Sequence, residues 1–190
     1  MLKLRKQFLI NLEQILSNYS SDQIEKASAV KAIFFDVDGV LTDGKIIYDD
    51  AGNEIKRFSV RDGLIIAHLR KAGIITGVIS GRESATVARR CAELKMDFCY
   101  QGISDKSAVC DKLMEEYRLK KSEVLFIGDD INDLPVFKKV GISVCPSDAA
   151  TYIQDNVDFV TSAKGGDGVV REIADLVLSA KGDMEKIING

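Results

Sequence analysis

Two carboxylates, separated by a single residue, follow an apolar run in the first quarter of the chain. Ala32–Phe35 is uniformly apolar, Asp36 and Asp38 come directly after it, and Gly39 follows them. Such a run is typical of a strand that is buried on both faces of a parallel sheet. In these sheets, ligands bind beyond the carboxyl ends of the strands, which is where the two carboxylates fall. An ordinary acidic turn has the same composition, so the interpretation depends on the residues at the ends of the other strands.

Later strand ends carry side chains that complement this pair of carboxylates. Ser80 and Arg82 follow the next predicted strand of the sheet, Asp129 and Asp133 follow a later one, and Lys106 opens a helix between them. Carboxylates that cluster at one edge of a sheet repel one another unless a cation lies among them. Hard oxygen ligands without a histidine or a thiol favour Mg²⁺. The sequence therefore predicts a magnesium site at the carboxyl edge of the sheet.

These residue types suit the hydrolysis of a phosphate ester. One carboxylate can attack phosphorus and form an aspartyl phosphate. A second carboxylate two residues further on can give a proton to the leaving alkoxide and later take one from water. Ser80 and Lys106 can bind the phosphoryl oxygens, because stabilisation of charge dominates catalysis of phosphoryl transfer.

Strands and helices must alternate along the chain to bring these residues together. After a first strand ending at residue 35, strands are expected at 74–79, 97–100, 124–127, 142–145 and 157–160, and helices at 64–71, 83–94, 106–117, 134–139 and 169–180. Repeated β-α units with short connections predict an α/β fold, with a Rossmann-like parallel sheet between two layers of helices. Two short strand-like runs that flank a turn predict a β-hairpin insertion at about residues 45–60. No segment is long enough for a separate cap domain.

The chain divides into a short extension and one domain. Apolar residues recur at helical spacing from residue 2 to residue 16, so residues 1–28 are expected to form an amphipathic helical extension. Charged residues interrupt this pattern, and we therefore expect neither a membrane span nor a signal peptide. Residues 29–190 are expected to form the α/β domain, with a C-terminal tail from about residue 164 and no regular structure after residue 182.

Composition narrows the class of protein. The chain has 190 residues, 46% of them apolar, and a net charge of −3 without blocks of like charge, so neither nucleic acid nor a membrane is an expected partner. Its four cysteines form no Cys-x-x-Cys pair and it has one histidine, so a zinc site is not expected. Reduced thiols in a cytoplasmic protein are the expected state of these cysteines.

The motifs resemble those of a known superfamily and, within it, of one family. In chain order, four of them resemble the motifs of the haloacid dehalogenase superfamily: Asp36-x-Asp38-Gly39-Val40-Leu41-Thr42, Ser80, Lys106 and Gly128-Asp129-Asp130-x-x-Asp133. Five segments resemble the cap-less phosphatases that act on 3-deoxy-D-manno-octulosonate 8-phosphate: Leu41–Gly44, Val60–Gly63, Ser80–Arg82, Tyr100–Gly102 followed by Asp105-Lys106, and Lys164–Glu172.

This resemblance implies a role for each residue of the site. Asp36 is the expected nucleophile and Asp38 the expected general acid and base. The magnesium ligands implied are Asp36, the main-chain carbonyl of Asp38, and Asp129. From its position, Asp133 is expected to orient Lys106 or the metal-bound water, with a helix N-cap before Leu134 as the alternative. The implied contacts with the phosphosugar substrate are Asp38, Ser59, Val60, Arg61, Asp62, Gly63, Arg82, Arg90 and Lys106. The resemblance also implies a homotetramer with the hairpins at its centre.

The expected reaction is hydrolysis of 3-deoxy-D-manno-octulosonate 8-phosphate, a step in lipopolysaccharide precursor synthesis. One departure leaves a second substrate open, since Ile65, Ile66 and Ala67 stand where the family usually has Gly-Ile and then Lys or Arg. The missing basic residue leaves a nonulosonate 9-phosphate of the sialic-acid type as an alternative. A catalytically silent oligomeric binding module is a further alternative, although such proteins usually lose a motif carboxylate or the lysine, and this chain keeps them all.

Overall fold

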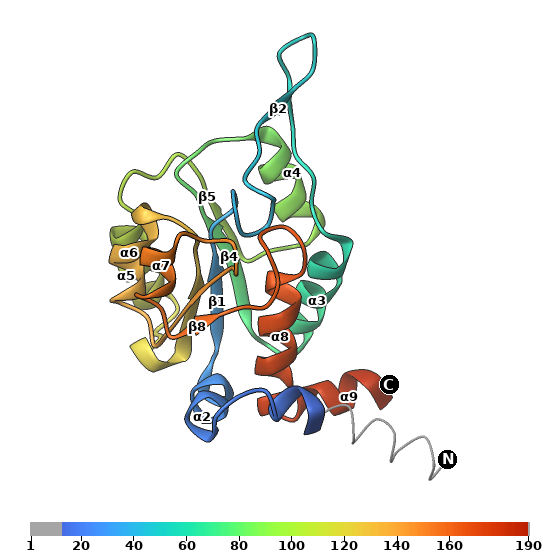
Figure 1. Cartoon of the computed structure of the whole chain (residues 1–190), viewed down its shortest axis with the longest axis vertical. Coiled ribbons are helices and arrows are strands. Elements are labelled where there is room, and N and C mark those ends of the chain that lie inside the picture. Colours follow the sequence, from blue (N-terminus) through green and yellow to red (C-terminus); the bar gives the residue numbers. More distant parts are fainter. Residues whose placement is uncertain (1–12, 190) are drawn as a thin grey trace.

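A six-stranded parallel sheet forms the centre of the computed structural model, which describes residues 13–189 (Figure 1). The strand order is β5-β4-β1-β6-β7-β8. The bounds are β1 (Ala32–Phe35), β4 (Ile75–Ile79), β5 (Phe98–Tyr100), β6 (Val124–Ile127), β7 (Ile142–Cys145) and β8 (Phe159–Val160). Every pairing in this sheet is parallel. The predicted Rossmann-like sheet is confirmed.

The position of β1 determines where a ligand can bind. Phe34 of β1 pairs with Gly77 of β4 on one side and with Phe126 of β6 on the other. The chain therefore winds outward in one direction from β1 through β4 and β5, and in the other through β6, β7 and β8. Such a reversal opens a crevice at the carboxyl ends of the central strands. All residues of β1, β6 and β7 are buried, as expected for strands that are covered on both faces.

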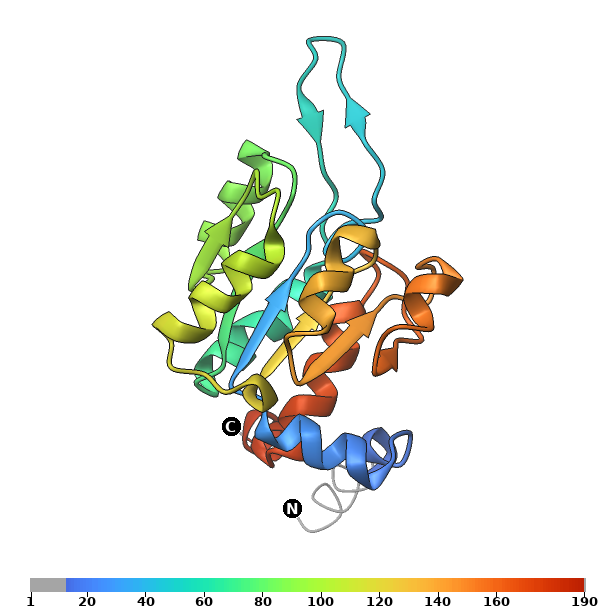
Figure 2. The same ribbon diagram turned by 90° about the vertical axis from the view of Figure 1, so that its left-hand side faces the viewer.

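Helices cover both faces of the sheet (Figures 1 and 2). One core lies between the sheet and the helices α3 (Val60–Lys71), α4 (Ala85–Glu93) and α8 (Val169–Ala180). The other core lies under α5 (Lys106–Glu116) and α6 (Leu134–Phe137). The shorter elements are α2 (Ser21–Ala29), η1 (Lys121–Glu123), η2 (Ile131–Asp133), α7 (Thr151–Gln154) and α9 (Asp183–Asn189).

Two helical boundaries differ from the predictions. The helix α3 begins at Val60, four residues earlier than expected, because the Ser59 hydroxyl accepts a hydrogen bond from the Asp62 N–H and caps the helix. The prediction of an irregular tail after residue 182 is wrong, because α9 forms there and buries Met184. Of the helix predicted over residues 2–16, residues 13–16 are helical, and residues 1–12 lie outside the described part of the chain.

The predicted hairpin is present and extends beyond the carboxyl edge of the sheet (Figure 2). It consists of β2 (Ile47–Tyr48) and β3 (Glu54–Ile55), which pair antiparallel. At its turn the Asp49 carboxylate accepts hydrogen bonds from the N–H groups of Ala51 and Asn53. The hairpin is thus organised by local hydrogen bonds, while its strands stand apart from both cores.

A glycine pair near the C-terminal end packs directly against the loop that follows β1. A Cβ atom on Gly165 would lie 2.0 Å from the carbonyl oxygen of Gly39, and one on Gly166 would lie 2.5 Å from the carbonyl carbon of Thr42. The Gly166 N–H donates to the carbonyl of Val40 at 2.9 Å. Only glycine permits two backbones to approach this closely, so the segment before α8 fixes the loop that carries the first motif.

All four cysteines are free thiols, three of them buried, so the structure contains no disulfide. Across residues 13–189, none of the helices combines the length and the apolar character that crossing a bilayer requires.

Candidate functional site

Three strand ends meet in one cavity. Asp36 follows β1, Ser80 follows β4, and Asp129 follows β6. The cavity has a volume of about 250 Å³. Its lining is formed by Asp36, Asp38, Gly44, Ser80, Gly81, Arg82, Asp129, Asp130 and Asn132. Polar residues that are distant in the sequence thus share one wall, as the parallel sheet requires.

A buried lysine joins two of the carboxylates. The Lys106 Nζ lies 2.7 Å from Asp133 Oδ1 and 2.9 Å from Asp36 Oδ1. Lys106 is 2% exposed and Asp133 is fully buried. Burial alone would lower the pKa of the Lys106 ammonium, but Asp36 and Asp133 outweigh it and raise that pKa above its ordinary value. Lys106 is therefore a fixed positive charge that contacts Asp36 directly.

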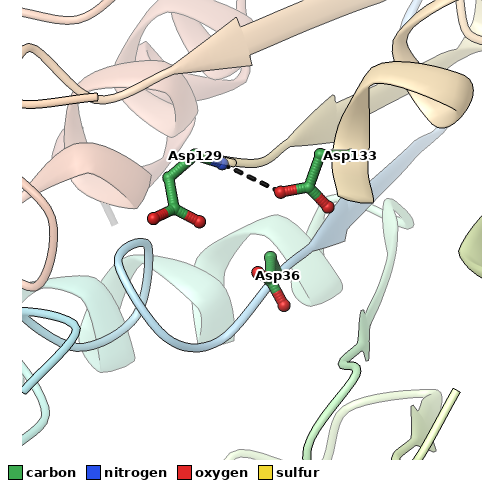
Figure 3. Close-up of side chains that lie close together, drawn as sticks. All are labelled: Asp36, Asp129 and Asp133. Carbon is green, nitrogen blue, oxygen red and sulfur yellow. Dashed lines mark hydrogen bonds between the residues drawn. The ribbon is translucent and has the colours of Figure 1, made fainter. Parts of the chain in front are cut away.

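Both carboxylate oxygens of Asp133 accept hydrogen bonds from neighbouring groups. Its Oδ2 accepts a hydrogen bond from the Asp129 N–H at 3.0 Å (Figure 3). The same oxygen accepts from the Asp130 N–H at 3.3 Å, and Oδ1 accepts from Lys106. A Cβ atom on Gly128 would lie 2.5 Å from the Asp133 carboxyl carbon, so glycine is needed for the chain to turn here. Asp133 therefore fixes both the lysine and the loop that carries Asp129.

The carboxylates of Asp36, Asp129 and Asp133 lie close enough together to repel one another unless a cation lies among them. Asp36, Asp129 and Asp133 each present an oxygen within 4.8 Å of the other two (Figure 3). Burial, with repulsion from Asp36, Asp133 and Asp130, raises the pKa of Asp129 to about 8. Burial and Asp133 raise the pKa of Asp36 to about 6, against the opposing effect of Lys106.

This donor set fits Mg²⁺, because it offers carboxylate oxygens and neither imidazole nor thiolate. Since both oxygens of Asp133 are engaged, Asp36 and Asp129 are the two side chains of this trio that can coordinate an ion. Gly39 contributes by its lack of a side chain, because a Cβ atom there would lie 1.9 Å from Asp129 Oδ2. The loop after β1 can therefore pass directly against Asp129.

We expect Asp129→Asn to have opposite effects with and without the metal. The folded-state pKa of Asp129, about 8, is above its ordinary 3.8, so its ionisation destabilises the metal-free fold increasingly as the pH rises between these values. At pH 9 the metal-free variant should melt about 2–4 °C higher than the wild type, which corresponds to about 1 kcal/mol. Mg²⁺ should raise the melting temperature of the wild type and leave that of the variant unchanged.

Differential scanning calorimetry in a chelator and in Mg²⁺ measures both effects. Asp155→Asn, at an exposed aspartate, is the matched control and should melt as the wild type does under both conditions. A variant that melted lower without metal and was still stabilised by Mg²⁺ would contradict the assignment of Asp129 as a ligand.

Asp38 lines the same cavity and is held from the hairpin side. Its Oδ1 is in contact with Lys56 Nζ and accepts a hydrogen bond from the Thr42 hydroxyl at 3.4 Å. Its Oδ2 lies 3.8 Å from Arg82 Nε. Sequence reasoning missed Lys56, which directly follows β3 and lies two residues after Glu54.

The expected substrate contacts in the segment 59–63 lie elsewhere in the single chain. Neither this segment nor Arg90 lines the cavity, whereas Arg82 does. The Asp62 carboxylate is buried and accepts a hydrogen bond from the Arg171 N–H at 2.8 Å, in the first turn of α8. Burial raises the pKa of Asp62, and its carboxylate connects α3 to α8.

Of the other residues in this segment, Gly63 is packed against Arg90, whereas Val60 and Arg61 are exposed. A Cβ atom on Gly63 would lie 2.3 Å from a guanidinium nitrogen of Arg90, whose charge lies over the Phe58 ring at 5.8 Å. Val60 and Arg61 are exposed on the surface beside them. Within one chain, these residues do not form part of the cavity wall.

Comparisons with known proteins show the family of this chain. The model of the haloacid dehalogenase-like hydrolase family matches residues 100–173. The 3-deoxy-D-manno-octulosonate 8-phosphate phosphatase of Escherichia coli is 40% identical over 88% of this chain and 89% of that protein. The corresponding phosphatase of Haemophilus influenzae is 42% identical over 83% of this chain and 88% of its own length.

Solved structures give the same result. The octulosonate phosphatase of Moraxella catarrhalis, in complex with magnesium, phosphate and the octulosonate sugar, is 35% identical and superimposes with a TM-score of 0.87 over 90% of this chain and 98% of that one. The cobalt-bound phosphatase of Haemophilus influenzae has a TM-score of 0.80 at 42% identity, over 83% of this chain and 92% of that one. This chain therefore belongs to the 3-deoxy-D-manno-octulosonate 8-phosphate phosphatases, a family of haloacid dehalogenase-like hydrolases.

Proposed function

We propose that this chain hydrolyses 3-deoxy-D-manno-octulosonate 8-phosphate to the free sugar acid and phosphate, with Mg²⁺ as cofactor. The observation that carries the proposal is the buried Lys106, which contacts Asp36 on one side and Asp133 on the other, beside the carboxylate of Asp129. In this arrangement the Asp36 carboxylate can accept a phosphoryl group, because Lys106 provides a positive charge beside it. The identity to phosphatases over most of the chain supports this substrate.

In the proposed reaction, Asp36 attacks phosphorus with the carboxylate oxygen that Lys106 does not hold. The bond from phosphorus to the sugar oxygen breaks, its electron pair goes to that oxygen, and Asp38 supplies the proton. Water then attacks the aspartyl phosphate, gives a proton to Asp38, and releases phosphate and free Asp36. Asp36, Asp129 and the main-chain carbonyl of Asp38 would hold Mg²⁺, which when bound would neutralise the charge of the phosphoryl group.

Other groups of the cavity have binding roles in this proposal. The Ser80 hydroxyl and Lys106 bind phosphoryl oxygens, and Arg82, which lines the cavity, meets the anionic sugar acid. The sequence departures of α3 do not alter the cavity, because Ile65 and Ile66 are buried in the core and none of residues 65–67 belongs to its lining.

We further propose a homotetramer, assembled through the hairpins, in the cytoplasm. The exposed apolar side chains on the hairpin are those of Ile46, Ile47, Tyr48 and Ile55. An apolar surface on a projecting element is typical of a protein interface. Light scattering should give four times the 20.9 kDa mass of one chain.

A substrate panel tests the proposed function. We expect the highest kcat/KM for octulosonate 8-phosphate, lower values for nonulosonate 9-phosphates and simple hexose phosphates, and loss of turnover in a chelator that Mg²⁺ reverses. A higher kcat/KM for a nonulosonate 9-phosphate would change the proposed substrate but leave the proposed phosphatase reaction unchanged. If no phosphomonoester is hydrolysed in Mg²⁺, the chain is a silent binding module and the proposal fails.

A further inference from the structure

A cluster of four ionic side chains connects the hairpin to the cavity. The Lys56 Nζ contacts Asp38 Oδ1 and lies 3.4 Å from Glu54 Oε1. The guanidinium of Arg82 lies 2.6 Å from Glu54 Oε1, and its Nε lies 3.8 Å from Asp38 Oδ2. Two cations and two carboxylates therefore alternate and balance one another in charge. Two members of the cluster come from the hairpin and the other two line the cavity.

Lys56 is unlike the other basic residues of this region. Its side chain is 1% exposed, whereas those of Lys45 on the opposite arm of the hairpin and Arg57 next to it are 75% and 81% exposed. Burying a lysine costs desolvation and rotamer entropy unless partners compensate for it. Here Asp38 and Glu54 provide that compensation, so the side chain of Lys56 is held in one orientation against Asp38.

We propose that Lys56 is a positioning residue, which holds Asp38 in the orientation that lets it transfer protons to and from the reacting oxygens. This inference rests on the proposed phosphatase function. Lys56 and the Thr42 hydroxyl both contact Oδ1 of Asp38, which leaves Oδ2 as the oxygen for proton transfer. Oδ2 gives its proton to the ester oxygen as that oxygen departs with the electron pair of its bond to phosphorus. It later takes a proton from the attacking water.

A positioning role has a chemical signature that a merely structural role does not share. A leaving group that is a strong base needs a proton from Asp38, whereas the weakly basic 4-nitrophenolate departs without one. If Asp38 loses its orientation, cleavage of phenyl phosphate must therefore slow much more than cleavage of 4-nitrophenyl phosphate. The two esters have the same shape near phosphorus and neither has a carboxylate, so a lost contact with a sugar acid cannot mimic the effect.

The test is Lys56→Met in Mg²⁺ with both aryl phosphates. We expect kcat/KM to fall by about 10–100-fold for phenyl phosphate and by less than about threefold for 4-nitrophenyl phosphate. Lys56→Arg, which keeps the charge, should recover part of the loss on phenyl phosphate. Lys45→Met removes an exposed lysine that pairs with Asp43 and should leave both values unchanged. Light scattering of each variant shows whether its assembly is intact.

A double-mutant cycle with Asp38→Asn provides a second measurement. If Lys56 acts through Asp38, then Lys56→Met should reduce kcat/KM by less than about threefold when Asp38 is already replaced. The cycle is measured on phenyl phosphate and on octulosonate 8-phosphate, which has an alkoxide leaving group. Equal losses on the two aryl esters, or fully additive losses in the cycle, would overturn the role of Lys56 and leave the phosphatase function intact. A wild-type protein that hydrolyses none of these esters would instead overturn the proposed function, and this inference with it.

Discussion

Asp36→Asn should abolish phosphate release from octulosonate 8-phosphate and from every other phosphomonoester, with a loss in kcat of at least ~10⁴-fold. An amide cannot attack phosphorus, so neither the metal nor Lys106 can rescue the first step. The fold should persist, because the variant removes a buried charge and Lys106 keeps its ion pair with Asp133 at 2.7 Å. Phosphate release and calorimetry measure the two results.

The covalent step can be observed directly. Wild-type protein that is denatured during turnover should carry one phosphoryl group on Asp36, and the variant should carry none. Asp130→Asn is the matched control: Asp130 lines the same cavity and caps the Ile131 N–H, which asparagine caps equally well, so most activity should remain. Substantial turnover by the Asp36 variant would show that another group is the nucleophile.

Lys106→Met should have the largest effect on stability. It would leave the carboxylates of Asp36 and Asp133 buried without their cation, and breaking a buried pair in this way costs about 3–5 kcal/mol. For a chain of this size we expect the melting temperature of the metal-free protein to fall by roughly 10 °C. Activity should be lost as well, because a phosphoryl oxygen loses its positive partner. Thermal unfolding and phosphate release measure both effects.

Two further variants identify the cause of that loss. Lys139→Met breaks an ion pair with Asp111 at the surface, where about 0–1 kcal/mol is expected, so it should melt close to the wild type. Adding Asp133→Asn to Lys106→Met removes one of the two buried carboxylate charges that have lost their cation, and it should recover part of the stability. If Lys106→Met melted like the surface control, Lys106 would not be the cation that stabilises the two buried carboxylates.

The sheet could be predicted from the sequence because local patterns determine it. The bounds of β6 and β7 agree with the apolar runs, since strands that are buried on both faces show no alternation that could blur their limits. The positions of Asp36, Ser80 and Asp129 at neighbouring strand ends follow from parallel topology. The contact of Lys106 with Asp133 is one of the two roles expected for Asp133, whereas the contact of Lys106 with Asp36 required the structure.

The parts of the site that depend on contacts between distant segments could not be predicted in the same way. The contact of Lys56 with Asp38 depends on how the hairpin folds back, and nothing in the local pattern fixes that angle. The attachment of Asp62 to the first turn of α8 joins residues 109 positions apart. Local spacing indicates that a carboxylate is present, but not which distant N–H it meets.

The glycine pair at 165 and 166 has a consequence for how the protein matures. The loop that carries Asp36 and Asp38 is made before the backbone that braces it, which follows more than a hundred residues later. At a synthesis rate of about 5–20 residues per second, the nascent catalytic loop waits several seconds for that support. A chain that has not yet been made as far as residues 165 and 166 therefore lacks the backbone contacts that fix this loop.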